Sequence, residues 1–110
     1  MGITKSEIFT TEQNQIALLA KTIGHPARVA ILQRLFVVND CICGDLVEDI
    51  GLAQATISQH LKELKNVGLI KGTISGTKVC YCIDGEKWTE MKNIMNKLFN
   101  QDIQLKEDCC

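Results

Sequence analysis

Apolar residues recur at three- and four-residue spacing through the first two thirds of the chain, and this period predicts four helices. The helices are expected from after Thr10 to Gly24, from Pro26 through Phe36, from Asp40 through Ile50 and from about Gln54 to Val67. Thr10 and Gln13 have the spacing of a capping box, in which each side chain hydrogen-bonds the backbone of the other residue. Gly24 and Gly68 end helices because glycine readily takes the conformation of a helix C-terminus.

The period then changes to two, which predicts extended strands. Residues 69–75 and 78–84 are expected to form a β-hairpin joined at Gly76-Thr77. A last helix begins near Gly85, and its apolar residues are Trp88, Met91, Met95 and Leu98, with Phe99 adjoining. The predicted fold is mainly α with one β-hairpin, in a single domain over residues 1–110. Its end, from about residue 101 to 110, is expected to be a flexible tail that carries two cysteines.

Residues 44–65 have the pattern of a helix-turn-helix: a short helix, a tight turn containing Gly51, and a second, amphipathic helix. The second helix has one apolar stripe and short polar side chains opposite it. Amides pair with adenine, hydroxyls with base edges or phosphates, and lysines with phosphates or guanine. The hairpin tip is placed to contact the flanking DNA as a wing. The residues expected to contact DNA are Gln54, Thr56, Ser58, Gln59, Lys62, Lys65, Thr77 and Lys78.

The net charge of −1 hides an uneven distribution of charged residues. Between residues 54 and 82 four lysines stand against Glu63 alone, a local balance of +3. This patch favours a polyanionic partner, and a solvated helix face without a partner fits the charges equally well. The longest apolar run, Ile16–Ala20, has five residues and is too short to span a membrane. The start of the chain lacks the apolar core of a signal peptide, so a cytoplasmic location is expected.

Six cysteines occur in three pairs, Cys41/Cys43, Cys80/Cys82 and Cys109/Cys110. In a reducing compartment these thiols point to soft-metal binding or redox sensing. Residues two apart lie about 200° apart around a helix, so the first pair binds one ion only where the chain is extended or distorted. The second pair shares one face of a strand, either as joint ligands or as core filler. The third pair has no packing use in a charged tail, which argues most strongly for function.

Four segments of the chain resemble the ArsR/SmtB family of winged-helix transcriptional repressors. They read HPARVAIL at residues 25–32, GDL at 44–46, QATISQHLKEL at 54–64 and GLI at 68–70. The resemblance implies a homodimer built from the first and last helices and a two-fold-symmetric operator. The apolar stripes of these two helices fit either a partner helix or the chain's own core. The resemblance also places His60 at a recognition-helix histidine, which either touches a phosphate or braces the helix.

Within this resemblance the cysteines imply an arsenic-responsive repressor. The family's best-known ligand pair is a Cys-x-Cys at the start of the third helix, and Cys41/Cys43 lie one residue out of register with it. Some arsenic sensors of the family carry thiolates at the C-terminus, as Cys109/Cys110 do here. Arsenite prefers three thiolates, so the tail pair needs Cys41 or Cys43 from the same or the other subunit. We therefore expect As(III), or else Cd(II) or Pb(II), to bind these cysteines and release the repressor from DNA.

Two other functions stay open on the sequence. The same repressor fits a sensor of oxidants or reactive sulfur species, in which two of the thiols form a disulfide or polysulfide. A cysteine-rich metal carrier or thiol enzyme without DNA binding fits less well. The sequence has no Cys-x-x-Cys, no cysteine with a candidate histidine base nearby and no phosphate-binding glycine loop. No enzymatic activity and no organic cofactor are therefore expected.

Overall fold

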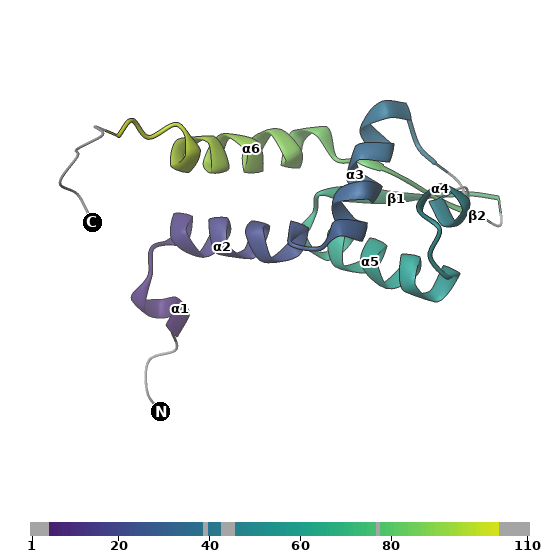
Figure 1. Ribbon diagram of the computed structural model, residues 1–110, viewed down its shortest axis with the longest axis horizontal. Helices are drawn as coiled ribbons and strands as arrows, with labels where there is room; N and C mark the ends of the chain where they lie inside the picture. The colour runs from purple at the N-terminus through teal and green to yellow at the C-terminus, as the bar shows by residue number, and fades with distance from the viewer. Residues whose placement is uncertain (1–4, 39, 43–45, 77, 104–110) are drawn as a thin grey trace.

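The computed structural model describes residues 5–38, 40–42, 46–76 and 78–103. Its elements are α1 (Lys5–Ile8), α2 (Thr11–Ile23), α3 (Pro26–Val38), α4 (Leu46–Ile50), α5 (Gln54–Val67), β1 (Ile70–Ser75), β2 (Lys78–Ile83) and α6 (Gly85–Phe99). This order is a winged helix-turn-helix topology, mainly helical with a β-hairpin, as the hydrophobic pattern predicts (Figure 1). The structure has one further helix, α1, which the sequence did not predict because its four residues are too few to show a helical period.

Local hydrogen bonds fix the helix ends that the sequence predicts. At the start of α2 the Gln13 backbone N–H donates to Thr10 Oγ1 at 3.1 Å, and the Thr10 N–H donates to Gln13 Oε1 at 2.9 Å. This reciprocal pair is the expected capping box. At the end of α5, Gly68 has a φ of 91°, and its N–H donates to the Lys65 carbonyl oxygen at 2.9 Å. Because a side chain is disfavoured in this left-handed conformation, glycine turns the chain from α5 toward β1.

The segment after α3 differs from the prediction. We expected Asp40 to begin the third helix, but α4 begins at Leu46 and Asp40 lies outside any helix. Asp40 Oδ1 instead accepts a hydrogen bond from the Cys41 backbone N–H at 2.7 Å. Ile42 is 6% exposed and forms an isolated antiparallel bridge with Tyr81 of β2. The bridge pairs backbone groups that burial would otherwise leave unsatisfied, and the local period of the sequence carries no information about so distant a partner.

The core is formed by the inward faces of α3 and α5 and the start of the hairpin. Its fully buried large side chains are Ile31, Leu35, Ile57, Leu64, Leu69 and Ile70. Burying each such side chain stabilises the fold by about 1.5–3 kcal/mol. Because the buried residues of α5 lie on one side of that helix, the core holds α5 by one face and leaves the other face to solvent.

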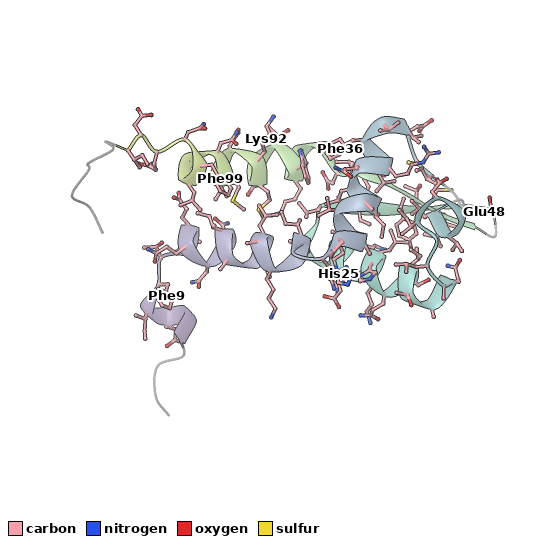
Figure 2. All side chains as sticks on the ribbon, in the orientation of Figure 1. Phe9, His25, Phe36, Glu48, Lys92 and Phe99 are labelled. Carbon is pink, nitrogen blue, oxygen red and sulfur yellow. The ribbon has the colours of Figure 1, made fainter. Side chains whose placement is uncertain are left out.

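α2 and α6 lie side by side and extend away from this core; we call the two helices the α2–α6 arm (Figure 1). Leu19 of α2 and Met91 of α6 are buried in the core cluster. Leu18 and Leu98 are each 50% exposed, and Phe99, near the free end of the arm, is 73% exposed (Figure 2). The apolar residues of these helices therefore serve partly as core and partly as exposed surface. None of the described helices is long and apolar enough to cross a membrane.

Candidate nucleic-acid interface and cysteine pair

α4 and α5 are the two helices of the predicted helix-turn-helix. Residues 51–53 join them, and Gly51 in this turn has a φ of 81°, which favours glycine. α5 buries Ile57, Leu61 and Leu64 at four- and three-residue spacing, as expected for the second helix of the motif. The turn and this apolar stripe together fix which side of α5 faces solvent.

The solvent side of α5 carries the polar residues that the sequence singled out. The exposed members are Gln54, Thr56, Ser58, Gln59, Lys62 and Lys65. Gln54 Nε2 donates to Ser58 Oγ at 3.1 Å, and Gln59 Nε2 donates to Glu63 Oε1 at 3.1 Å. Each amide keeps further donor and acceptor capacity beyond this one bond. The face therefore presents amides, hydroxyls and lysines on one rigid helix, the combination that reads base edges and phosphates in a major groove.

His60 also belongs to α5, but its side chain is turned inward and is 8% exposed. Its Nδ1 accepts a hydrogen bond from Arg28 Nε at 3.1 Å, and its ring lies 4.4 Å from the ring of His25. Burial, together with the charges of His25 and Arg28, lowers the pKa of His60 and keeps the imidazole neutral, as an acceptor must be. Because Arg28 also donates to the Thr22 carbonyl oxygen at 3.0 Å, this cluster joins α2, α3 and α5. The placement favours the bracing role of His60, and its contact with a phosphate stays a prediction.

The hairpin has the predicted shape and nearly the predicted bounds. β1 and β2 pair antiparallel from Ile70 opposite Ile83 to Ser75 opposite Lys78. Gly76 follows β1 with a φ of 64°, as a tight hairpin loop requires. Thr77 and the side chain of Lys78, both predicted to contact DNA, lie outside the described part of the structure.

The bridge between Ile42 and Tyr81 places Cys41 beside Cys82. Ile42 N–H donates to the Tyr81 carbonyl at 2.8 Å, and Tyr81 N–H donates to the Ile42 carbonyl at 2.9 Å. Residues flanking such a hydrogen-bonded pair oppose each other in the closer, non-hydrogen-bonded register, where side chains approach best. Cys41 and Cys82 occupy this register, both are free thiols, and a side-chain hydrogen bond joins them. Two segments far apart in the sequence thus form one pair of thiols.

The cysteine pair opens onto a pocket of about 450 Å³ between α3, the hairpin and α6. Its lining residues include Asp40, Lys71, Leu35, Phe36, Ile83 and Trp88 in addition to the two cysteines. Phe36 and Trp88 meet edge to face, with ring centroids 4.8 Å apart. The pocket therefore has an apolar, aromatic wall next to the sulfur atoms.

The surroundings of Cys82 act on its thiol in opposite directions. The hydrogen bond to Cys41 and burial raise the pKa of Cys82, and Asp40 adds to the rise. Lys71, which pairs with Cys82 across the hairpin, acts against it and lowers the same pKa. Cys82 is accordingly held in its protonated, hydrogen-bonded form, with a cation nearby that favours loss of its proton.

The structure brings together a different set of cysteines from the set predicted. Cys41 lies with Cys82, which the sequence reading left as either ligand or core filler, while Cys43, Cys109 and Cys110 lie outside the described residues. Cys80 is 3% exposed and disulfide-bonded. Within the described ranges, no group of three or more His, Cys, Asp or Glu side chains is placed to hold a metal ion. The sequence reading missed the pairing of Cys41 with Cys82, which no local spacing shows because the bridge joins segments far apart in the sequence.

Known proteins match this arrangement along most of the chain. The model of a family described as "Bacterial regulatory protein, arsR family" matches residues 25–71. The biofilm growth-associated repressor of Xylella fastidiosa is 29% identical over 86 residues, covering 78% of this chain and 75% of that protein. An uncharacterized HTH-type transcriptional regulator of Mycobacterium tuberculosis is 33% identical over 79 residues, covering 71% of this chain and 68% of that protein.

Solved structures give the same picture. A crystal structure of a Mycobacterium tuberculosis protein superimposes with a TM-score of 0.65 at 28% identity, covering 84% of this chain and 92% of that chain. The transcriptional repressor BigR from Xylella fastidiosa has the same fold, with a TM-score of 0.60 at 24% identity and coverage of 91% and 100%. With the exposed polar face of α5 in a winged helix-turn-helix, these matches show that the chain belongs to the arsR family of bacterial regulatory proteins and is a DNA-binding transcriptional regulator, not an enzyme.

Proposed function

We propose that this chain is a homodimeric repressor that binds a two-fold-symmetric operator through α5 and leaves it when As(III) binds cysteine thiolates. The observation that carries the DNA-binding part is the rigid α5 helix, buried on one side and lined with amides, hydroxyls and lysines on the other. Two related proteins, from Xylella fastidiosa and Mycobacterium tuberculosis, are named repressors, which supports repression as the outcome of binding. A regulator of this kind acts in the cytoplasm, where bacterial DNA lies.

In this proposal each subunit inserts α5 into a major groove, with the two half-sites about one duplex turn, 34–36 Å, apart. The contacts are those predicted from the sequence: Gln54, Thr56, Ser58, Gln59, Lys62 and Lys65 on the helix, with Thr77 and Lys78 on the wing. The amides read base edges, and the lysines contact phosphates or guanine. Because the lysines displace counterions from DNA, affinity falls steeply as salt rises.

The dimer is proposed to form through the α2–α6 arm. Leu18, Leu98 and Phe99 on this arm expose half or more of their surface, and so does Phe9, which precedes it. Figure 2 shows Phe9 and Phe99 toward the end of the arm that is remote from α5. A set of large apolar side chains left in solvent supports association with a second copy, since burying them against an identical arm gains hydrophobic free energy.

The inducer is proposed to be As(III), with Cd(II) and Pb(II) as further thiophilic candidates. Soft thiolates select such ions, and arsenite takes three thiolates in a pyramid. The proposed ligands are Cys41 and Cys43 together with Cys109 and Cys110, from one subunit or across the dimer. Cys41 supports this proposal because it is half-buried and opens onto a pocket.

A second candidate signal is an oxidant or a reactive sulfur species. The hydrogen-bonded thiols of Cys41 and Cys82 favour it, because a pair of adjacent thiols is the substrate for disulfide or polysulfide formation. In this case the repressor and its operator are the same, and the chemical step on the cysteines differs.

The proposed function is tested by fluorescence anisotropy of the protein on labelled DNA from its own promoter, at fixed salt and in a phosphine reductant that does not bind arsenic. Saturable binding as a dimer, followed by release at about one equivalent of arsenite per subunit, is the expected result. Binding that survives arsenite and is lost on addition of peroxide or polysulfide moves the assignment to the second candidate. Failure to bind the promoter in any state would overturn the proposal. Sedimentation velocity of the same sample checks the dimer.

A further inference from the structure

We propose that Cys41 and Cys82 bind trivalent arsenic together, as two thiolates on either side of the Ile42–Tyr81 bridge, and that this pair is the sensing site. The inference rests on the proposed function and names its site. It differs from the set predicted from the sequence because it includes Cys82 of the wing and needs neither cysteine of the tail. The structure supports it by geometry, by the pocket and by the position of the pair in the fold.

The geometry suits one ligand atom bound to both sulfurs. Ile42 and Tyr81 exchange two backbone hydrogen bonds of 2.8 and 2.9 Å, so their neighbours Cys41 and Cys82 stand in the register where side chains on paired strands lie closest. The two thiols already share a hydrogen bond. An arsenic atom that bonds to both sulfurs replaces this hydrogen bond and leaves the backbone pairing intact.

The chemical step balances without an oxidant or a reductant. Arsenous acid, As(OH)3, exchanges two hydroxyls for two thiolates, so that two As–O bonds break and two As–S bonds form. The two thiol protons leave with the hydroxyls as two water molecules, and arsenic stays trivalent. Lys71, across the hairpin from Cys82, favours the loss of the Cys82 proton.

The third substituent on the arsenic atom is directed into the pocket. No third free thiol lies beside the pair in the described residues, because Cys80 is disulfide-bonded. The third substituent is therefore a hydroxyl, when the ligand is arsenite, or an organic group, when the ligand is a monosubstituted arsenical. Both share the two-thiolate chemistry, and a volume of about 450 Å³ walled by Phe36 and Trp88 has room for either.

The position of the pair connects the site to both DNA-reading parts. Cys41 lies in the segment that leads into α4, and α4 and α5 form the helix-turn-helix. Cys82 lies in β2, the second strand of the wing. An arsenic atom bonded to both sulfurs links these segments covalently. This link changes how far the wing can move relative to the helix-turn-helix.

The test uses Trp88, the one tryptophan of the chain, which lines the pocket. Its emission is followed while full-length protein that keeps the Cys80 disulfide is titrated with phenylarsine oxide, which bonds to two thiols, or with arsenite. The proteins compared are the wild type, Cys41→Ser, Cys82→Ser, a control that carries Lys92→Ala at an exposed position of α6, and a tail variant that replaces the ligands proposed from the sequence with Cys109→Ser and Cys110→Ser. Circular dichroism melting establishes that each variant is folded.

The wild type and Lys92→Ala are expected to bind one equivalent of phenylarsine oxide with the same affinity. Each of Cys41→Ser and Cys82→Ser is expected to weaken binding by about 100-fold or more, because the second As–S bond is intramolecular. Wild-type affinity in Cys41→Ser or Cys82→Ser, or loss of binding in the tail variant, would overturn the site. Binding of both ligands identifies a hydroxyl as an acceptable third substituent, and binding of phenylarsine oxide alone identifies an organic one.

Two further measurements separate this inference from the proposed function. Where a serine variant does not fold, alkylation of the wild type replaces it: the arsenical is expected to protect Cys41 and Cys82 together, and protection of other cysteines in their place contradicts the proposal. Promoter DNA anisotropy on the same samples reports the function. Arsenical binding at this pair without release of DNA leaves the site standing and refutes the arsenic-responsive repressor. Release of DNA by the arsenical in Cys82→Ser supports the arsenic-responsive repressor and refutes the Cys41–Cys82 site.

Discussion

The α5 helix and the Cys41–Cys82 pair are both candidate functional sites, and the chain builds them in different ways. α5 is a single run of 14 residues in which a helical period separates the buried side from the exposed side. The cysteine pair joins the segment after α3 to β2 through a single bridge. A site carried by one element can therefore be altered one face at a time, whereas a site assembled from two segments depends on the pairing between them.

The largest expected effect comes from the buried side of α5. Leu64 has no exposed surface, and Leu64→Ala is expected to lower the free energy of unfolding by about 2–5 kcal/mol through lost burial and a cavity. Urea unfolding followed by circular dichroism measures it. The neighbouring exposed Lys65→Ala is the matched control and is expected to stay within about 0.5 kcal/mol of the wild type. Equal losses in both variants would mean that the two faces of α5 are not distinct.

The exposed side of α5 is expected to show the opposite behaviour. Gln59→Ala removes an amide that can pair with a base edge, so operator affinity is expected to fall by about 1–3 kcal/mol per half-site while the unfolding free energy stays unchanged. Anisotropy at fixed salt measures the affinity. Lys92→Ala, exposed on α6, serves as the control for a remote surface change (Figure 2). Operator binding by the Gln59 variant as tight as that of the control would argue against this face as the reader.

A change at Phe36, in the wall of the pocket next to Cys41 and Cys82, tests whether this pocket is independent of α5. Phe36→Leu removes the edge-to-face contact with Trp88 and is expected to cost about 0.5–1.5 kcal/mol of unfolding free energy. Emission from Trp88 is expected to change, because its neighbouring ring is lost, while operator affinity stays the same. Val37→Ala, at a 77% exposed position on the same helix, is the control for stability. A loss of DNA binding in the Phe36 variant would show that the pocket and α5 are not separable.

The smallest effect at neutral pH concerns His60. Its pKa in the folded protein lies below the ordinary value of 6.5, so the unfolded chain binds the proton more readily than the folded one. This contribution to stability is fully present above pH 6.5 and is lost as the pH falls through that value toward the folded-state pKa. His60→Asn keeps a hydrogen-bond acceptor for Arg28 but does not titrate. Melting temperatures between about pH 7.5 and 5.5 are expected to fall less in this variant than in the wild type. An equal fall of the melting temperature in both proteins would contradict the contribution of His60.

The same contrast explains how far the sequence could be interpreted. The helices α2, α3, α5 and α6 and the hairpin follow from local periods and caps, since each involves residues within a few positions of one another. The exposed face of α5 follows from the same period. Asp40 was wrongly expected to begin a helix, because the extended course of the chain there depends on Tyr81. Cys82 was left open as a joint ligand with Cys80 or as core filler, because its partner Cys41 is identified only when the bridge between the two segments is known.

Asp84 forms a tight corner that couples the orientation of α6 to that of β2. This single residue separates the last residue of β2 from the first residue of α6, and it is held by its own N–H on the Leu69 carbonyl at 3.0 Å and by its carboxylate on the Lys87 N–H at 3.2 Å. α6 has 15 residues and so acts as a lever about 22 Å long. A tilt of about 10° at the corner moves its far end by about 4 Å, slightly more than the 3.4 Å rise of one base pair. A small rotation of β2 is thus amplified at the far end of α6, in the arm where a second copy is proposed to bind.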